Sequence, residues 1–466
     1  MSLISVQAAI YGILLLEASF SAAQQCILVK PNVLNGVPTP APTPTVVQTG
    51  GTQSGTIAPS TTPTLAPFAY GKDPIRSVNL GGWFVLEPWI TPTLFQNTNN
   101  SAIVDEYTLG QMLDHDVALG ILQNHWETWF TEDDFADIQA AGLNHVRMQI
   151  GYWSVPLTSS DTNYTTSVSP YIPGAWPYLL QALNWARKYQ LHVILDLHGA
   201  PGSQNGYDNS GQRTGNPLWG TNTTVPRTFD VINFIVKNIG GMIDMFELIN
   251  EPAAYVGTIN ALLPDFYKQG YQLVRDIAGD DLQVMIHDGF LGVQSWTNFL
   301  TYPSAQGVFM DFHEYQIFNT FQIEMNFTQH LQYSCQVLSS LKSFADSNIF
   351  TVIGEWTAAP TDCAKWLNGR GVGARWDGSW QPNQPTYGSC TGFTGNMSTF
   401  SDSYKKFLRQ YWEAQVQIGE AIQGWGFWTW KAENADDWSY QAGLKGGWIP
   451  QDPTQMLYPN MCGQNG

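Results

Sequence analysis

Two glutamates, far apart in the chain, each follow a short apolar segment. Glu251 comes after Met245–Ile249 in an Asn-Glu-Pro triplet, and Glu355 comes after Phe350–Ile353 in a Gly-Glu-Trp triplet. Paired carboxyl groups can divide one reaction between them, because the environment can keep one protonated while the other stays ionised. A single glutamate after a strand is more often a helix cap or a solvated end, so the pair needs support from its surroundings.

The chemistry that best suits such a pair is cleavage of a glycosidic bond. In a retaining glycosidase two carboxyl groups lie roughly 5–5.5 Å apart. One protonates the leaving oxygen, the other attacks the anomeric carbon, and the first then acts as base for water. Asn250 can hydrogen-bond a sugar 2-OH beside Glu251, and Trp428 or Trp430 could stack on a sugar face.

Strands and helices that alternate along the chain must position these residues. The expected strands are nearly continuous apolar runs, as in strands buried on both faces, and they are Ser77–Leu80, His145–Ile150, His192–Leu197, Met245–Ile249, Gln283–Ile286, Gly307–Phe312, Phe350–Ile353 and Gly424–Trp428. Helical patterns lie between them, at Glu132–Ala141, Trp176–Lys188, Arg227–Ile239, Leu262–Ala278, Gln329–Ala345 and Tyr404–Ile418. This alternation predicts an α/β fold, a (β/α)8 TIM barrel with a single catalytic domain.

Nearly every expected strand ends in a polar or aromatic residue. In a barrel of this class the active site lies at the carboxyl ends of the strands. The residues in question are Gly81-Gly82-Trp83 and Glu87, Arg147, Asp196 and His198, Asn250 and Glu251, His287-Asp288, Asp311 to Tyr315, Glu355, and Trp428 to Lys431. So many coincident ends indicate one functional rim that includes both glutamates.

The composition excludes several classes of partner. Acidic residues number 38 against 20 Lys and Arg, for a formal charge of −18. A nucleic-acid or anionic-membrane binder needs basic clusters, so we expect neither partner. Hydrophobic residues make up 43% of the chain and only 12% are charged, which favours a large core over disorder. Nineteen Trp residues suit both that core and the stacking of uncharged ligands.

The first residues predict export. The apolar run Ala8–Phe20 is interrupted by Glu17 and followed by small residues, so we expect a signal peptide over 1–23. A Pro/Thr-rich disordered stalk is expected over 24–67 and the (β/α)8 catalytic domain over 68–466. No run is long enough for a membrane span. Sequons for N-glycosylation, consistent with a secreted, extracellular or cell-wall protein, occur at Asn99, Asn163, Asn222, Asn326 and Asn396.

The cysteines favour disulfides over a metal site. Cys26 falls ahead of the expected domain, and the remaining four allow three pairings, with no Cys-x-x-Cys spacing. His313-Glu314-Tyr315 has no second His at ligand spacing. No phosphate-binding loop, His-Glu-x-x-His motif or nucleophile elbow is present. We therefore expect no metal and no cofactor.

Several motifs together resemble glycoside hydrolase family 5 of clan A. They are the two glutamate triplets with Val78–Trp83, Glu87–Ile90, His198–Gly206 and Phe427–Lys431. The four segments other than the glutamate triplets are similar to those of the fungal exo-β-1,3-glucanases. The resemblance covers the chain from about Pro74 to its end. An Asn-Glu-Pro triplet alone is weak, but the ordered set, each motif at its expected strand, is highly specific.

The resemblance implies a role for each matching position. Glu251 would be the acid/base and Glu355 the nucleophile, which Arg147 would hold ionised. The other substrate-binding residues would be Glu87, His198, Tyr207, Asn250, His313, Tyr315, Phe318 and Trp430. Tyr207 and Phe318 match an aromatic clamp at the entrance, although those enzymes carry Phe where this chain has Tyr207. Packing in the barrel is the alternative role for Trp430. The resemblance also implies disulfides Cys335–Cys462 and Cys363–Cys390.

The resulting expectation is a secreted, monomeric, retaining exo-β-1,3-glucanase that releases glucose from non-reducing ends of β-1,3-glucan. A related β-glycosidase that acts on plant diglycosides or aryl β-glucosides is the alternative, and the sequence separates the two poorly. A wall-binding or structural protein on an inactive barrel is a third interpretation. Both glutamates and their supporting residues are present, which disfavours it. Only the resemblance, and no feature of composition, suggests exo rather than endo cleavage.

Overall fold

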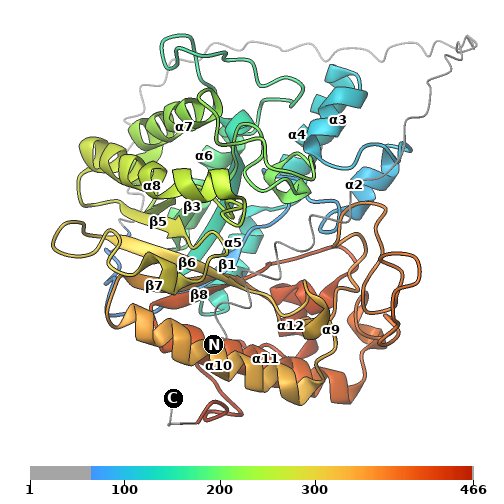
Figure 1. The fold of residues 1–466 in the computed structure, drawn as a ribbon. Helices are drawn as coiled ribbons and strands as arrows, with labels where there is room; N and C mark the ends of the chain where they lie inside the picture. Colours follow the sequence, from blue (N-terminus) through green and yellow to red (C-terminus); the bar gives the residue numbers. More distant parts are fainter. Residues whose placement is uncertain (1–64, 464–466) are drawn as a thin grey trace, which may run out of the picture.

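The computed structural model describes residues 65–463, in which eight parallel strands close into a barrel (Figure 1). The strands are β1 (Ile75–Asn79), β2 (His145–Gly151), β3 (His192–Gly199), β4 (Met245–Glu247), β5 (Gln283–His287), β6 (Val308–Glu314), β7 (Phe350–Trp356) and β8 (Gly424–Phe427). Each strand pairs with its neighbours in chain order, and β8 returns to β1. The predicted (β/α)8 barrel is confirmed. The signal peptide and nearly all of the stalk predicted over 24–67 lie outside the described residues.

Helices surround this barrel (Figure 1). They are α2 (Pro92–Asn97), α3 (Glu106–Met112), α4 (His115–Thr128), α5 (Glu132–Ala140), α6 (Trp176–Lys188), α7 (Thr224–Ile239), α8 (Gly257–Ala278), α9 (Thr320–Ile323), α10 (Phe327–Ala345), α11 (Asp402–Glu420) and α12 (Tyr440–Gly446). The six predicted helices are present. α8 begins five residues before the predicted Leu262 and tolerates Pro264 in its second turn. The sequence did not predict α2, α3, α4, α9 and α12.

The inside of the barrel has an apolar floor. It consists of one side chain from each of six strands: Ile75, Ile194, Met245, Met285, Phe309 and Val352. Phe68 and Tyr70 pack against this layer from the segment before β1. Tyr70 also donates to His145 Nε2 at 3.1 Å at the start of β2. Phe68 therefore marks where the chain joins the core.

Alternation along the strands places charged residues above that floor. Side chains two positions apart point to the same face of a strand. Asp311 and His313 on β6 therefore share the face that Phe309 directs into the barrel. The β6–β7 register pairs His313 with Glu355, after an irregularity at Phe312/His313. These two polar side chains thus stand side by side near the carboxyl end of the barrel.

Two disulfides fix the chain beyond the strands. Cys335 on α10 is bonded to Cys462, and Cys363 is bonded to Cys390, the two pairings that the resemblance implies. The second bond closes a loop within the long connection between β7 and α11. It constrains this connection, which starts at the carboxyl end of β7.

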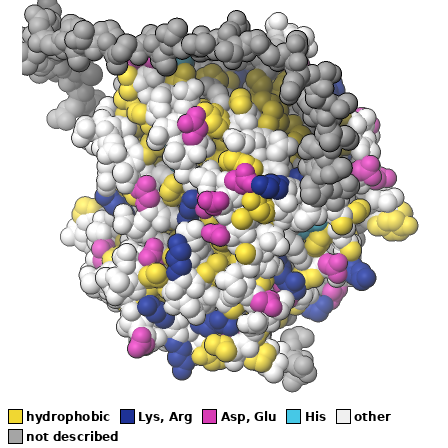
Figure 2. All heavy atoms as spheres, turned by 180° about the vertical axis from the view of Figure 1, so that it is seen from behind, with side chains coloured by type: hydrophobic (Ala, Val, Ile, Leu, Met, Phe, Trp, Pro, Cys, Tyr) yellow, Lys and Arg dark blue, Asp and Glu magenta, His cyan; other side chains and the backbone are white. Residues whose placement is uncertain are grey.

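The surface carries mixed charge. Figure 2 shows Lys and Arg side chains interspersed with Asp and Glu over one face, without a continuous basic patch on it. The sequon asparagines Asn99, Asn163, Asn222, Asn326 and Asn396 are all exposed, and Asn326 is also the N-cap of α10. Across residues 65–463, no helix combines the length and apolar character that a membrane span requires.

Candidate active site

The two glutamates lie on either side of one imidazole. Glu251 follows β4 and Glu355 lies on β7, and His313 projects between them from β6. His313 Nδ1 is 2.8 Å from Glu251 Oε1 and 3.4 Å from Glu355 Oε2. These two oxygens can therefore be no more than 6.2 Å apart, the sum of those distances. The bound lies below the roughly 6.5–9.5 Å of inverting glycosidases.

Arg147 on β2 lies at the centre of a cluster of carboxylates below this pair. Its guanidinium contacts Asp196 at 3.0 Å, Glu247 at 2.7 Å, Glu355 at 2.7 Å and Asp311 at 3.7 Å. Burial alone would lower the pKa of Arg147, but the charges of these four carboxylates raise it well above its ordinary value. Arg147 therefore stays charged and can balance more than one buried anion.

Glu355 receives a hydrogen bond on each of its oxygens. Arg147 Nη1 donates to Oε1 at 2.7 Å, and the Tyr315 hydroxyl donates to Oε2 at 2.9 Å. Burial raises the pKa of Glu355 above its ordinary value, while the positive charges of His313 and Arg147 oppose the rise. Donors on both oxygens favour the ionised form, which a nucleophile needs.

Glu251 has a different environment. Its Oε1 faces His313, and its Oε2 accepts a hydrogen bond from Asn209 Nδ2 at 2.8 Å. Burial works to raise the pKa of Glu251, yet the hydrogen bond and charge of His313 outweigh it and lower that pKa to about 2. Its φ of 44° lies in the left-handed region, where a non-glycine residue is strained. The surrounding structure must hold the residue in this conformation.

His313 contacts a third carboxylate in addition to the two glutamates. Its Nε2 lies 3.1 Å from Asp311 Oδ2, so both ring nitrogens face carboxylate oxygens. Burial lowers the pKa of His313, but Glu355, Asp311 and Glu251 raise it well above its ordinary value. Carboxylates at both ring nitrogens thus favour the protonated form of His313.

Two buried polar atoms at this rim point at no protein partner. His198 Nδ1 bonds to Asp196 Oδ2 at 2.6 Å, and its Nε2 has no partner among the described residues. Asn250 Oδ1 accepts from Arg147 at 2.9 Å, and its Nδ2 is likewise unpartnered there. Buried polar groups are normally paired, so two orphans beside the glutamates indicate a place for a polar ligand.

Glu87, in the loop after β1, faces the same space. It accepts a hydrogen bond from Trp89 Nε1 at 2.8 Å and is 5% exposed. Burial, and then the negative charge of Asp208, raise its pKa well above the ordinary value, with smaller effects of Glu355 and Glu251. The negative charges of both site glutamates thus act on the carboxyl group of Glu87.

The role predicted for Trp430 does not fit its position, and we correct it. Trp430 is fully buried, and its indole N–H donates to Asp134 Oδ1 on α5 at 3.0 Å. Its ring is therefore directed toward the helical layer. Trp428 instead stacks on the His198 ring with centroids 5.7 Å apart and planes 12° apart. In a regular strand two tryptophans two residues apart would face the same way. Because β8 ends at Phe427, the two rings can point in different directions.

The two residues of the expected clamp lie on different connections. Tyr207, just before the turn Asp208–Ser210, is 51% exposed. Phe318 follows β6, is half-buried and packs edge-on against Tyr315 with centroids 5.4 Å apart.

Sequence reasoning assigned no role to several residues that build the site. Asp311 accepts from the Gly354 N–H at 2.7 Å and thereby fixes the backbone next to Glu355. Glu247 accepts two hydrogen bonds from Arg147, and Asn209 bonds to Glu251. The available signal was a charged residue in the middle of an apolar strand, as at Glu247 and Asp311.

Three residues of the site could in principle surround a cation. Glu251, His287 and His313 each offer an atom within 4.8 Å of the others. His287 lies on β5, too far from His313 in the sequence for a ligand-spacing motif to pair them. However, His287 Nδ1 accepts from the Gly289 N–H at 2.9 Å, which leaves the ring proton on Nε2. His313 has carboxylates at both nitrogens. Protons thus occupy the positions where a metal needs lone pairs.

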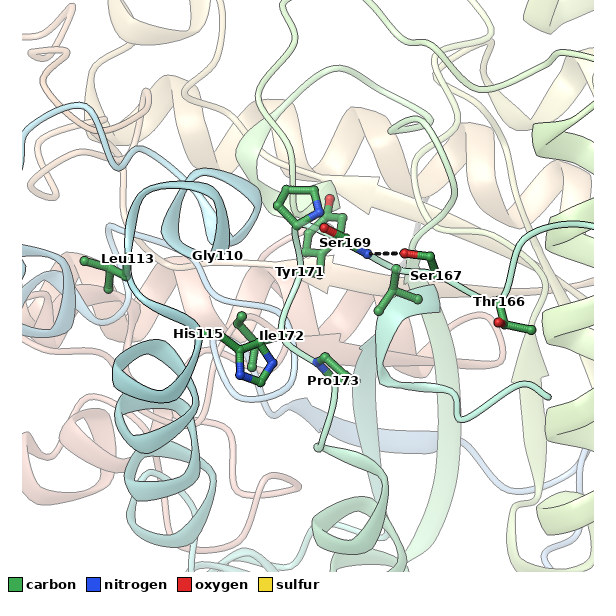
Figure 3. A pocket seen from close by; sticks show the side chains of 11 residues that line it. Gly110, Leu113, His115, Thr166, Ser167, Ser169, Tyr171, Ile172 and Pro173 are labelled. Atoms are coloured by element: carbon green, nitrogen blue, oxygen red, sulfur yellow. Dashed lines mark hydrogen bonds between the residues drawn. The ribbon is translucent and has the colours of Figure 1, made fainter. Parts of the chain in front are cut away.

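A separate pocket lies beside α3, the start of α4 and the segment 166–173 (Figure 3). Gly110, Leu113 and His115 line it from the helical side, and Ser169 N–H donates to the Ser167 hydroxyl at 3.3 Å within the segment. None of the described residues that line this pocket carries a carboxyl side chain. The two-carboxylate arrangement belongs to the mouth of the barrel.

Comparison with known proteins gives consistent matches. The family model described as Cellulase (glycosyl hydrolase family 5) matches residues 114–368. A glucan 1,3-beta-glucosidase of Blumeria graminis is 42% identical over 403 residues, which cover 85% of this chain and 91% of that protein. A glucan 1,3-beta-glucosidase of Candida oleophila is 41% identical over 408 residues, or 84% and 92% of the two chains. A rutinosidase structure from Aspergillus niger aligns with a TM-score of 0.63 at 17% identity, over 82% of this chain and 100% of that one, a likeness of fold.

Proposed function

This chain belongs to glycosyl hydrolase family 5 and is a glycoside hydrolase, and from that premise we propose that it is a retaining exo-β-1,3-glucanase that releases glucose from the non-reducing ends of β-1,3-glucan. The names of relatives that are 41% and 42% identical support the substrate and linkage. The observation that carries the retaining mechanism is the upper bound of 6.2 Å between oxygens of Glu251 and Glu355. This bound is shorter than the separation that leaves room for the attacking water in inverting enzymes.

The first step forms a covalent intermediate. A carboxylate oxygen of Glu355 attacks the anomeric carbon while the bond from that carbon to the leaving oxygen breaks. The leaving oxygen takes a proton from Glu251, so a neutral alcohol departs. In the second step water attacks the same carbon, gives its proton to Glu251 and releases Glu355. Two inversions at one carbon leave the product in the β configuration.

The proton for this cycle comes from the Glu251–His313 pair. His313 Nδ1 is 2.8 Å from Glu251 Oε1, which is hydrogen-bond distance for direct transfer. A bound sugar excludes water and raises the cost of a charge on Glu251, which favours moving the proton onto it. When Glu355 becomes a neutral ester, its negative charge no longer opposes ionisation of Glu251. Glu251 can then act as base.

The sugar whose bond is cleaved would occupy the space beside the unpartnered atoms His198 Nε2 and Asn250 Nδ2. Asn250 would bond the 2-OH, and Glu87 would bond hydroxyls at the far end of the ring. The face of Trp428 would stack on the sugar. Tyr207 and Phe318 would hold the leaving sugar outside.

One time course tests this proposal. Proton NMR of a linear β-1,3-glucan with the enzyme should show glucose as the first product, initially as the β-anomer. Release of oligosaccharides first would contradict exo action, and α-glucose first would contradict retention. Cleavage of a flavonoid diglycoside with no action on glucan would replace the glucanase by the alternative β-glycosidase.

A variant tests the role of the nucleophile. Glu355→Gln should abolish turnover, because the amide cannot form the ester, while binding to insoluble β-1,3-glucan in a pull-down remains. Glu413→Gln, on α11, alters a buried carboxylate that bonds to Leu457 N and Tyr458 N, and it should keep turnover. Turnover near the wild-type rate in Glu355→Gln would contradict the assignment.

The proposal extends to location. We propose a secreted monomer of the extracellular space or cell wall, with the predicted signal peptide removed and a stalk ahead of the barrel. The two disulfides support an oxidising compartment. Mass spectrometry of the exported protein would locate its first residue and any glycan at the five sequons.

A further inference from the structure

The first turn of α3 contacts three separate parts of the site. Glu106, the first residue of this helix, is 1% exposed. Its Oε2 accepts the Leu86 N–H at 3.0 Å, and its Oε1 accepts Trp153 Nε1–H at 2.7 Å. Leu86 directly precedes Glu87. One carboxylate thus joins the loop after β1 to the residue that follows β2.

The indole of Trp153 packs against the backbone of two segments that border the site. A Cβ at Gly199 would lie 2.5 Å from its ring, and a Cβ at Gly211 would lie 2.1 Å from it, so both backbones lie directly on the indole. Gly199 follows His198 at the end of β3. Gly211 ends the turn that carries Asn209, the residue bonded to Glu251.

The neighbours of Glu106 attach to the same turn. Tyr107 N–H donates to Gly211 O at 3.0 Å, and Asp105 Oδ2 accepts the Arg213 N–H at 2.6 Å. The other face of Trp153 stacks on Tyr171 at 4.0 Å with planes 3° apart. Tyr171 also lines the pocket beside α3 (Figure 3). Stacking fixes the plane of the indole but lets it slide, and the bond to Glu106 removes that freedom.

We propose that Glu106 is a positioning residue that holds the Glu87 loop and the Asn209 turn in fixed relation to each other. The alignment of Glu251 with the leaving oxygen then depends on it. This inference rests on the proposed acid/base role of Glu251. Glu106 itself is enclosed between Leu86 and Trp153 and acts only through them.

A carboxylate is required because both of its partners are N–H donors. A glutamine at position 106 would present one oxygen and one NH2, so one donor would face another donor. Either the Leu86 backbone or the Trp153 indole would then have to move. A misplacement of about 1 Å can cost up to 10²-fold in rate.

The experiment compares leaving groups on the same sugar. Dinitrophenolate leaves from its β-glucoside without being protonated, whereas the phenol oxygen of phenyl β-glucoside needs a proton from the acid in order to leave. In Glu106→Gln we expect the ratio of kcat/KM values, phenyl over dinitrophenyl, to fall about tenfold, because kcat/KM reports the first step, in which only the phenyl substrate needs an aligned acid. A lower fraction of folded enzyme reduces both rates equally and leaves this ratio unchanged. An unchanged ratio would therefore overturn the proposal.

Further variants keep the test decisive. Trp153→Phe removes the indole N–H together with the five-membered ring, and it should lower the same ratio if Glu106→Gln does not fold. The double variant should equal Glu106→Gln alone, since both changes break one link; additive effects would overturn the inference. Glu413→Gln should leave the ratio unchanged. Because both probes are aryl glucosides, failure to cleave glucan would overturn the proposed substrate and leave this test valid.

Discussion

Tyr315→Phe removes one hydrogen bond from Glu355 and changes little else. The Tyr315 hydroxyl donates to Glu355 Oε2 at 2.9 Å, while its ring packs against Phe318 and Trp438. Phenylalanine preserves this packing. The second donor, Arg147, keeps its bond to Oε1 at 2.7 Å. The perturbation therefore reports the effect of a single O–H on the ionisation of Glu355.

The size of the effect follows from the charge of the acceptor. A hydrogen bond to a charged group stabilises it by about 1.5–3 kcal/mol, and one pKa unit corresponds to about 1.4 kcal/mol. Loss of a donor to the ionised form raises a carboxyl pKa. We expect the pKa of Glu355, which burial already raises, to rise by about 1–2 units more. Below that pKa the reactive form becomes about tenfold rarer per unit.

The assay is the pH dependence of kcat/KM with dinitrophenyl β-glucoside, whose leaving group needs no acid. The acidic limb of the profile should move up by about 1–2 units in Tyr315→Phe. Tyr404→Phe removes a hydroxyl that bonds to Phe393 O at 2.9 Å, far from the glutamates, and should leave the limb in place. An unmoved limb in a folded Tyr315→Phe protein would refute the assignment of that limb to Glu355.

Three further outcomes follow from the same structure. Glu251→Gln should lose turnover of phenyl β-glucoside yet still form the covalent intermediate from the dinitrophenyl substrate, and added azide should restore turnover as β-glucosyl azide; equal loss on both substrates would argue against an acid role. Gly354→Ala places a Cβ 2.2 Å from Asp311 Oδ1, so kcat should fall about 10²-fold, whereas Gly257→Ala, which meets no atom within 4 Å, should be silent. Burial raises the pKa of Glu314 to about 8, so the folded state binds this proton more tightly than the unfolded chain does. The stability from that proton is complete below the ordinary carboxyl pKa and is lost as the pH rises toward 8. Urea midpoints should therefore decrease from about pH 5 to about pH 8, and a rising midpoint would contradict the burial argument.

The strands could be predicted because the barrel buries them on both faces. Continuous apolar runs such as His192–Leu197 and Phe350–Ile353 are typical of strands that neighbouring elements cover on both sides, and a polar residue after each one marks the functional rim. The short helices between β1 and β2 could not be predicted in this way. α3 is seven residues long, and its stability comes from contacts such as those of Glu106 with Leu86 and Trp153.

The site was predictable where a residue lies next to a strand and less so where a loop turns. His198 and Glu355 lie within their strands, so their direction follows from alternation. Trp428 and Trp430 come after the last residue of β8, where alternation no longer applies. The residues alone left both open as a sugar platform, and the resemblance named Trp430, whose ring is fully buried. Asn209 lies on a turn whose position depends on α3, so no local pattern identifies its bond to Glu251.

The division of the site between strands and connections bears on how its specificity can change. Arg147, His198, His313 and Glu355 belong to the closed barrel, where each is bonded to another side chain of the barrel strands. Tyr207 is an exposed side chain just before the turn Asp208–Ser210. Mutations of such exposed side chains can accommodate new leaving groups at low cost to stability, while the residues that break the bond stay unchanged. A laboratory selection for a new glycoside should therefore accumulate its changes in the connections and leave the barrel interior untouched.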